Sequence, residues 1–177
     1  MIKLITILST LICVGLNHKP SHISFYKSQT YGNYCNQRYG YCIDYPLNVL
    51  YPQPISTNGD GRIFESKDGK VVLSVYGLQN WNVSTRSEES ISDKFDDDLH
   101  NNTPGLHRII THQKLNSTNY VISGYEQIAT GGRSKQMLFY QKTIIKAHSF
   151  CTATIEYDES SKTLVNQILD RIFKSFK

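Results

Sequence analysis

Alternating apolar and polar residues predict a series of strands along most of the chain. Residues 39–45 alternate as a half-buried strand that ends at Pro46, because proline cannot donate to a strand ladder. Residues 62–66 and 71–78 flank a Lys-Asp-Gly-Lys turn at 67–70, and Asp-Gly is typical of tight hairpins because glycine accepts positive φ. Four further strands are predicted, with Gly131-Gly132 between the second and the third, at about 107–116, 119–128, 136–146 and 148–157.

Two segments have helical periodicity instead. In the first, Ile91, Phe95 and Leu99 recur every fourth residue, and Thr85 and Glu88 have capping-box spacing. The run Asn101-Asn102-Thr103-Pro104-Gly105 is expected to end this helix. The second segment, at about 159–176, has a broad apolar face that suits packing flat on a sheet, formed by Leu164, Val165, Ile168, Leu169, Ile172, Phe173 and Phe176.

The order of strands, helix, antiparallel strands and helix predicts an α+β fold, in which an antiparallel β-sheet is sandwiched with two main helices. A chain of 177 residues most naturally holds one domain. The segment 17–33 is polar and rich in turn formers, and we expect it to be a leader into a single domain over 34–177.

Residues 1–16 have the pattern of a secretory signal, with one positive charge before an apolar run too short to cross a bilayer. The alternative is a buried amino-terminal helix or strand. No Ala-x-Ala site is present, so cleavage is expected after Gly15 or later, up to about residue 21. Ile12 before Cys13 disfavours a lipoprotein anchor, because a lipobox has a small residue there. With no other span in the sequence, we expect a protein that is periplasmic or secreted and soluble after cleavage.

Removal of residues 1–16 would leave three cysteines, an odd number. A bridge between Cys35 and Cys42 would close a short loop and stabilise the fold by about 2–3 kcal/mol on the chain-entropy model. Cys151 alternates with Ala153 and Ile155 on an apparent core-facing side, where a free thiol behaves as a small hydrophobe. We favour the Cys35–Cys42 disulfide with Cys151 free and buried, while pairing of Cys151 with either of the others stays open.

The charge composition gives no indication of a highly charged binding partner. The formal net charge is +4, and removing Lys3 with the signal leaves 18 basic against 15 acidic side chains, a net of +3. That surplus is too small to indicate binding to nucleic acid.

Motifs for catalysis or metal binding are missing from the sequence. The six histidines lack metal-ligand spacing, no Gly-x-Ser-x-Gly is present, and His148 and Cys151 would point to opposite faces of one strand. The Asn-Gly-Asp-Gly run at 58–61 is better explained as a turn than as a calcium or phosphate site, and Asp96-Asp97-Asp98 as a solvated helix face. We expect no enzyme activity, catalytic residue, metal or cofactor.

Aromatic residues supply the remaining signal, since seven of the twelve tyrosines fall between residues 26 and 51. We expect Tyr39, Tyr41 and Tyr45 to fill the core. Three others lie in loop-like segments and are candidate interface residues, because Tyr and Trp are enriched at protein–protein hot spots. They are Tyr31, Tyr34 and Trp81.

Four segments resemble the PsbP-like superfamily and together span almost all of the chain after the signal. They are RYGYCIDYP at 38–46, GDGRIFESKDGKVVLSVYG at 59–77, YVISGYE at 120–126 and ATIEYDESSKTLVNQILDRIFKSF at 153–176. The superfamily includes an extrinsic photosystem subunit, the nuclear-transport cofactor Mog and small bacterial envelope proteins. The resemblance implies the fold and a non-enzymatic binding or assembly role, and it carries over no catalytic residues. The paired cysteines and the hairpin are most similar to exported bacterial members.

The sequence therefore favours a non-catalytic periplasmic protein that binds another protein, as an envelope accessory or an immunity-type inhibitor. The alternative is a module that binds a small ligand or lipid on the concave face of the sheet. An apolar pocket of several hundred Å³ would favour that alternative. The oligomeric state stays open.

Overall fold

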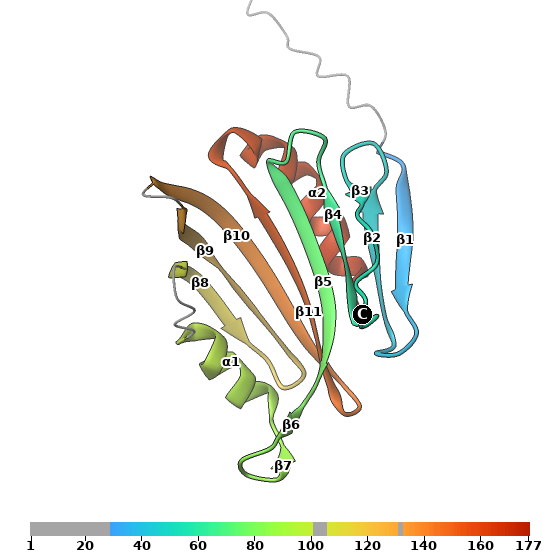
Figure 1. The fold of residues 1–177 in the computed structure, drawn as a ribbon, viewed down its shortest axis with the longest axis vertical. Helices are drawn as coiled ribbons and strands as arrows, with labels where there is room; N and C mark the ends of the chain where they lie inside the picture. Colours follow the sequence, from blue (N-terminus) through green and yellow to red (C-terminus); the bar gives the residue numbers. More distant parts are fainter. Residues whose placement is uncertain (1–28, 101–105, 131–132) are drawn as a thin grey trace, which may run out of the picture.

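The computed structural model describes residues 29–100, 106–130 and 133–177, and its main feature is a seven-stranded antiparallel sheet (Figure 1). The strands run in the order β3-β4-β5-β11-β10-β9-β8 across the sheet. Their bounds are β3 (Tyr51–Pro52), β4 (Gly61–Glu65), β5 (Val71–Gln79), β8 (Leu106–Leu115), β9 (Asn119–Thr130), β10 (Arg133–Lys146) and β11 (Ser149–Tyr157).

Two hairpins and two helices complete the described fold. One hairpin pairs β1 (Tyr31–Asn36) with β2 (Tyr41–Pro46), and the other pairs β6 (Trp81–Asn82) with β7 (Ser87–Glu88). The helices are α1 (Ile91–Leu99) and α2 (Lys162–Ser175), the latter preceded by a single 3-10 turn, η1 (Glu159–Ser161). A mostly antiparallel sheet with two helices is an α+β fold, as the pattern predicts. No helix in the described ranges is long and apolar enough to cross a membrane.

The long strands and α2 lie close to their predicted bounds, but β1 was not predicted. Its first three residues were expected to belong to the leader at 17–33, because Gly32 and Asn33 are turn formers. They form a strand because β2 provides a full ladder for them, from Tyr31 opposite Pro46 to Asn36 opposite Tyr41. The predicted signal at 1–16, and the two turns at 101–105 and 131–132, lie outside the described residues.

The start of α1 differs from its prediction. Thr85 and Glu88 do not form a capping box, because Glu88 lies in β7 and pairs with Trp81. Ser90 caps the helix instead, with its hydroxyl accepting a bond from the main chain of Asp93 and the Asp93 carboxylate accepting one from Ser90. The acidic residue of this box is an aspartate, so the Ser/Thr-x-x-Glu/Gln pattern missed it.

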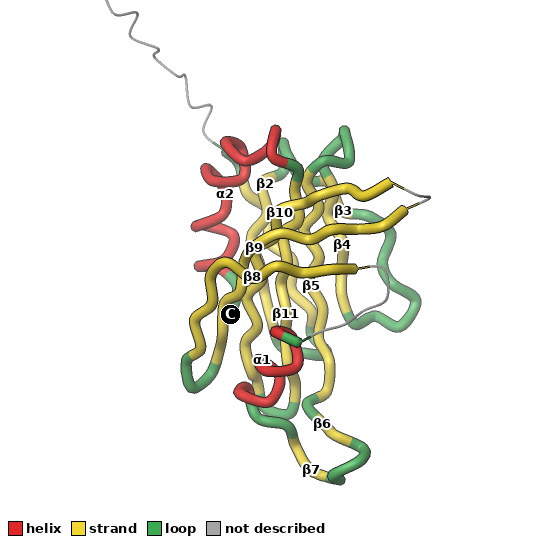
Figure 2. Tube along the Cα trace, turned by 90° about the vertical axis from the view of Figure 1, so that its left-hand side faces the viewer, coloured by secondary structure: helices red, strands yellow, loops and turns green. Residues whose placement is uncertain are grey.

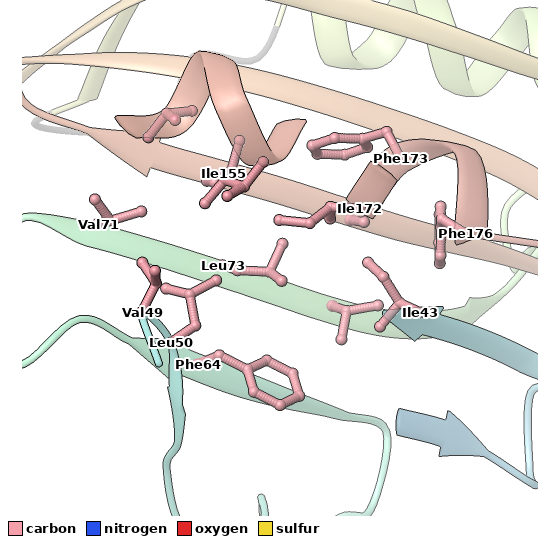
Figure 3. Packing of buried hydrophobic residues seen from close by; sticks show 14 of the residues in the cluster. Ile43, Val49, Leu50, Phe64, Val71, Leu73, Ile155, Ile172, Phe173 and Phe176 are labelled. Atoms are coloured by element: carbon pink, nitrogen blue, oxygen red, sulfur yellow. The ribbon is translucent and has the colours of Figure 1, made fainter. Parts of the chain in front are cut away.

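The main core lies between α2, hairpin β1–β2 and one face of the sheet (Figure 3). Residues that alternate on β5 and β11 supply the floor, including Leu73, Val75 and Ile155, which are at most 1% exposed. From the opposite side, the predicted apolar face of α2 and the aromatic face of β2 close over them. The fully covered members of these two elements are Tyr41, Ile43, Val165, Ile168, Ile172 and Phe176.

A smaller core lies on the opposite face of the sheet, under α1. Phe150 belongs to this cluster and Cys151 to the main one, and consecutive strand residues point to opposite faces. The apolar stripe of α1 covers it as predicted, with Ile91 and Phe95 packed against Tyr120.

Asp98 corrects the expectation that the three aspartates of α1 form a solvated face. Asp96 and Asp97 are exposed, but Asp98 is only 7% exposed. It lies three residues after Phe95 and seven after Ile91, which places it on the same helix face. The carboxylate pairs with Lys94 and accepts bonds from the Tyr120 hydroxyl and the Gln141 amide.

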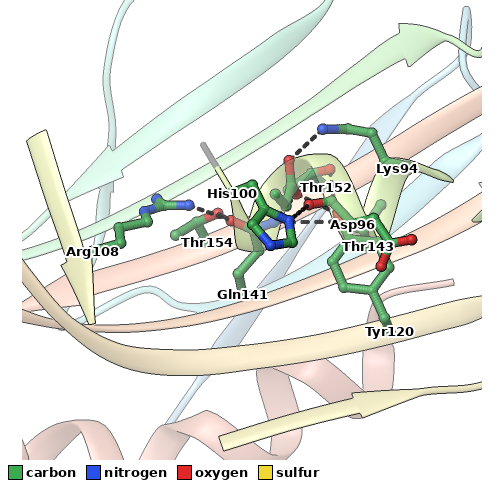
Figure 4. Close-up of polar contacts among 10 residues, drawn as sticks. Lys94, Asp96, His100, Arg108, Tyr120, Gln141, Thr143, Thr152 and Thr154 are labelled. Carbon is green, nitrogen blue, oxygen red and sulfur yellow. Dashed lines mark hydrogen bonds and ion pairs between the residues drawn. The ribbon is translucent and has the colours of Figure 1, made fainter. Parts of the chain in front are cut away.

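Through the Gln141 amide, this carboxylate connects to a row of polar side chains across the sheet, and Figure 4 labels Gln141 and Thr154 in that row. Gln141 lies in the middle of the row, where its carbonyl oxygen accepts bonds from Thr154 and Arg108. Arg108 forms an ion pair with Glu126, which is 1% exposed. A buried charge is costly unless it is paired, so each member of the row depends on its neighbours.

Replacing Asp98 therefore tests the row. Asp98→Ala removes the partner of Lys94 and leaves two buried donors unsatisfied, and we expect the free energy of unfolding to fall by about 3 kcal/mol. Asp97→Ala, one residue earlier but exposed, should change it by less than about 0.5 kcal/mol. Urea denaturation of both variants measures the difference, and equal stabilities would contradict the structural role of Asp98.

Candidate binding surface

Hairpin β1–β2 carries the predicted disulfide. Cys35 and Cys42 are directly opposite each other in the ladder, with Cα atoms 4.1 Å apart, and they are bonded. Cys151 is a free thiol, fully buried in the main core, and burial raises its pKa to about 11. His148 is exposed in the turn before β11 and bonds Glu88 rather than the thiol. The cysteine chemistry of the described chain is therefore structural.

The tyrosines of this hairpin pack inward to different degrees. Tyr41 is fully buried, while Tyr39 and Tyr45 are partly buried against the main core. Tyr39 lies across β5 so closely that a Cβ on Gly77 would be 2.1 Å from its ring.

Tyr34 and Tyr31, two of the three candidate interface residues, also contact the folded domain. Tyr34 packs edge-on against Tyr41 and Phe64, with ring centroids 6.2 and 5.8 Å away. The guanidinium of Arg171 lies 3.9 Å from the ring centroid of Tyr31. Both tyrosines are partly buried, so intramolecular packing already uses much of their surface.

Trp81, the third candidate, belongs to an exposed apolar surface. It is 53% exposed on hairpin β6–β7, which projects beyond the end of the sheet (Figure 2). Val83 in the same hairpin is 80% exposed, and Leu78 and Tyr76 at the end of β5 are 53% and 40% exposed. We call Tyr76, Leu78, Trp81 and Val83 the apolar surface.

A hollow of about 330 Å³ adjoins this surface. It lies between the loop at 54–60 and strands β4 and β5, and Tyr76 lines it together with Ile63, which is 48% exposed. The loop is held by its own side chains, since Asp60 accepts bonds from Ser56 and Asn58. These bonds give the Asn-Gly-Asp-Gly run its predicted turn role and form one wall of the hollow.

An acidic rim borders the other side of the apolar surface. Glu88 lies opposite Trp81 in hairpin β6–β7, and a second hollow of about 360 Å³ brings it together with Glu89, Asp93 and Asp97. In the described ranges, no three His, Cys, Asp or Glu side chains are grouped so that they could hold a metal ion. The rim therefore supplies negative charge beside apolar contact area.

Sequence patterns identified only part of this surface. Trp81 was found because a tryptophan in a loop-like segment is conspicuous. Tyr76 and Leu78 were missed because alternation in β5 shows that two faces exist, but not which parts of each face the helices cover. The acidic rim was missed because Glu88 was assigned to a capping box at the start of the helix.

Comparisons with known proteins identify the fold. No family model matches the chain, and no curated protein matches its sequence. The solution structure of cyanobacterial PsbP (CyanoP) from Synechocystis sp. PCC 6803 matches over 96% of this chain and 98% of its own, with a TM-score of 0.55 and 13% identity. The crystal structure of the Saccharomyces cerevisiae Ran-binding protein Mog1p matches over 85% and 96%, with a TM-score of 0.54 and 10% identity.

The chain has the PsbP-like fold. The resemblance predicted from the four sequence segments is thereby confirmed, and at these identities the likeness concerns the architecture alone. The PsbP-like fold here places hairpin β1–β2 and α2 on one face of the sheet and leaves the β4–β5 part of the other face uncovered by α1.

The thiols give a direct test of the stapled hairpin. Without reductant, iodoacetamide at pH 7.5 should leave Cys151 unmodified in the folded protein, because the thiol is buried and its raised pKa keeps it protonated. Unfolding in urea should expose one reactive thiol among Cys35, Cys42 and Cys151, and prior reduction should expose all three. Peptide mass spectrometry distinguishes these states, and labelling of Cys35 without reductant would contradict the disulfide.

Proposed function

We propose that this chain is a non-catalytic, exported accessory protein that binds another protein through the apolar surface and the hollow beside it. The observation that carries the proposal is the group of Tyr76, Leu78 and Trp81, which are large, lie within six residues of the chain and are 40–53% exposed. Binding hot spots are enriched in tyrosine and tryptophan and fill pockets on the partner. Large exposed apolar patches on small domains commonly mark interaction sites.

The chemistry of the surface indicates which residues the partner should present. The hollow of about 330 Å³ suits one aromatic or branched anchor side chain from the partner. The acidic rim favours basic residues around that anchor, because complementary charges raise association rates and select partners. The fitting partner is thus a protein surface with a projecting apolar anchor and a basic margin.

Further support comes from the fold and from the disulfide. Mog1p, which shares the fold, is a Ran-binding protein, so the architecture can present a protein-binding surface. A disulfide persists in oxidising compartments, which supports export to a periplasm or the cell exterior. An envelope accessory or an immunity-type inhibitor is consistent with these features.

Partner capture with paired variants tests the proposal. The tagged protein should retain a specific protein from the envelope fraction of its source organism. Tyr76→Ala with Trp81→Ala should weaken that complex at least about tenfold, because each removes a large contact side chain.

Ile109→Ala with Leu115→Ala is the matched control. These apolar side chains on β8 are 44% and 40% exposed, and β8 lies at the opposite edge of the sheet from β4. Their replacement should leave the affinity unchanged. Equal loss in both double variants, or retention in both, would overturn the assignment of the apolar surface.

A further inference from the structure

Two hollows lie on the other face of the sheet, one where α2 meets β9 and β10 and one beyond the end of α2, between β10 and hairpin β1–β2. The first, about 590 Å³, has apolar walls from both sides, with Val121 and Tyr140 on the strands and Leu169 and Phe173 on α2. The second, about 510 Å³, lies toward the end of the chain and is lined by residues that include Ile144 and Phe176. Both volumes are in the range of sites that bind small molecules. We call the two hollows together the α2 groove.

Lys142 is the one residue that lines both hollows. Its ammonium group donates to the carbonyl oxygens of Phe173 and Phe176, at 2.8 and 3.1 Å, where α2 ends. Burial lowers the pKa of Lys142, and none of the ion pairs among the described residues includes it. An ammonium group has three donors, so one remains for a ligand at the point where the hollows meet.

The side-chain charge of the α2 groove is strongly positive. Lys174 lines the first hollow, and Lys146 and Lys177 line the second. Among the described residues, Asp170 is the only acidic side chain in either lining, and it pairs with Lys174 at 2.7 Å. Four lysines against one aspartate leave a net of +3 over an apolar floor, although the whole chain has a net of only +4.

We propose that the α2 groove binds a single-chain amphipathic anion, with the carboxylate of a fatty acid at Lys142 and its hydrocarbon chain along the apolar floor. Apolar walls on both sides match a hydrocarbon chain, and a carboxylate would accept the remaining donor of the partly buried ammonium in a charge-assisted hydrogen bond. The site lies on the opposite face of the sheet from the apolar surface, because Lys142 is opposite Ala153 and Tyr76 is opposite Thr152 in the ladder. It is therefore a second site, independent of protein binding.

A series of probes with one tail and different head groups tests the charge requirement in the unaltered protein. The anionic probe is dodecanoate, the cationic one is dodecyltrimethylammonium and the neutral one is dodecyl maltoside, each titrated below its critical micelle concentration. Acetate carries the same carboxylate as dodecanoate but no hydrocarbon chain. Amide chemical shifts report the site. Dodecanoate should bind at least about tenfold more tightly than the cationic and neutral probes, with shifts confined to the elements that line the groove, which are β9, β10, α2 and the residues after it, and hairpin β1–β2. Raising the salt concentration should weaken the binding of dodecanoate.

Charge reversal locates the site. The double variant Lys146→Glu with Lys174→Glu should bind dodecanoate at least about tenfold more weakly. The control, Lys67→Glu with Lys70→Glu in the β4–β5 turn, should bind dodecanoate with unchanged affinity. Lys142→Arg should retain binding and Lys142→Met should abolish it. Should a Lys142 variant fail to fold, the head-group series still decides, because it needs no substitution.

Binding of the cationic probe as tightly as dodecanoate, shifts on the face that carries Tyr76, or an affinity indifferent to the Lys146/Lys174 reversal would each overturn the proposal. Acetate binding with an affinity equal to dodecanoate would also overturn it, since the site would then be an anion site without a hydrocarbon subsite.

Discussion

Burial of the apolar face of α2 is the interaction on which the rest of the domain depends. Val165, Ile168 and Ile172 are fully buried, and each such side chain contributes about 1.5–3 kcal/mol relative to exposure. The sheet covers only one side of this face, and hairpin β1–β2 covers the other with Tyr41 and Ile43. The end of the helix is then fixed to that hairpin, because the Lys177 and Cys42 main chains exchange two hydrogen bonds, at 3.0 and 3.3 Å.

The periodicity of hydrophobic residues was sufficient to predict the helices and strands that bury one continuous apolar face. The strands from β8 to β11 and the face of α2 follow from sequence because each has many residues with one clear period. β1 could not be predicted, since its glycine and asparagine contradict strand propensity and only pairing with β2 makes it a strand. The cap of α1 was misplaced because its acidic member is an aspartate. The burial of Asp98 could not be predicted, because a polar residue on an apolar helix face is recognised only when its partners are in place.

The two proposed sites differ in how much of each could be predicted from the sequence. The apolar surface contains one conspicuous residue, Trp81, while Tyr76 and Leu78 come from strand positions that would be core if a helix covered them, and Val83 lies in a turn. The α2 groove has no local signature, because its four lysines come from β10, α2 and the residues after α2.

The position of β11 and α2 along the chain has a consequence for biogenesis. Strands β3–β5 join strands β8–β10 only through β11, so the sheet stays in two halves until that strand is synthesised. The main core also includes the apolar face of α2, so it is complete only when the chain has been made to about residue 176. Cys35 and Cys42, seven positions apart, need only their own hairpin to meet. The arrangement therefore separates two events, since the hairpin can be oxidised before the sheet and the main core are complete.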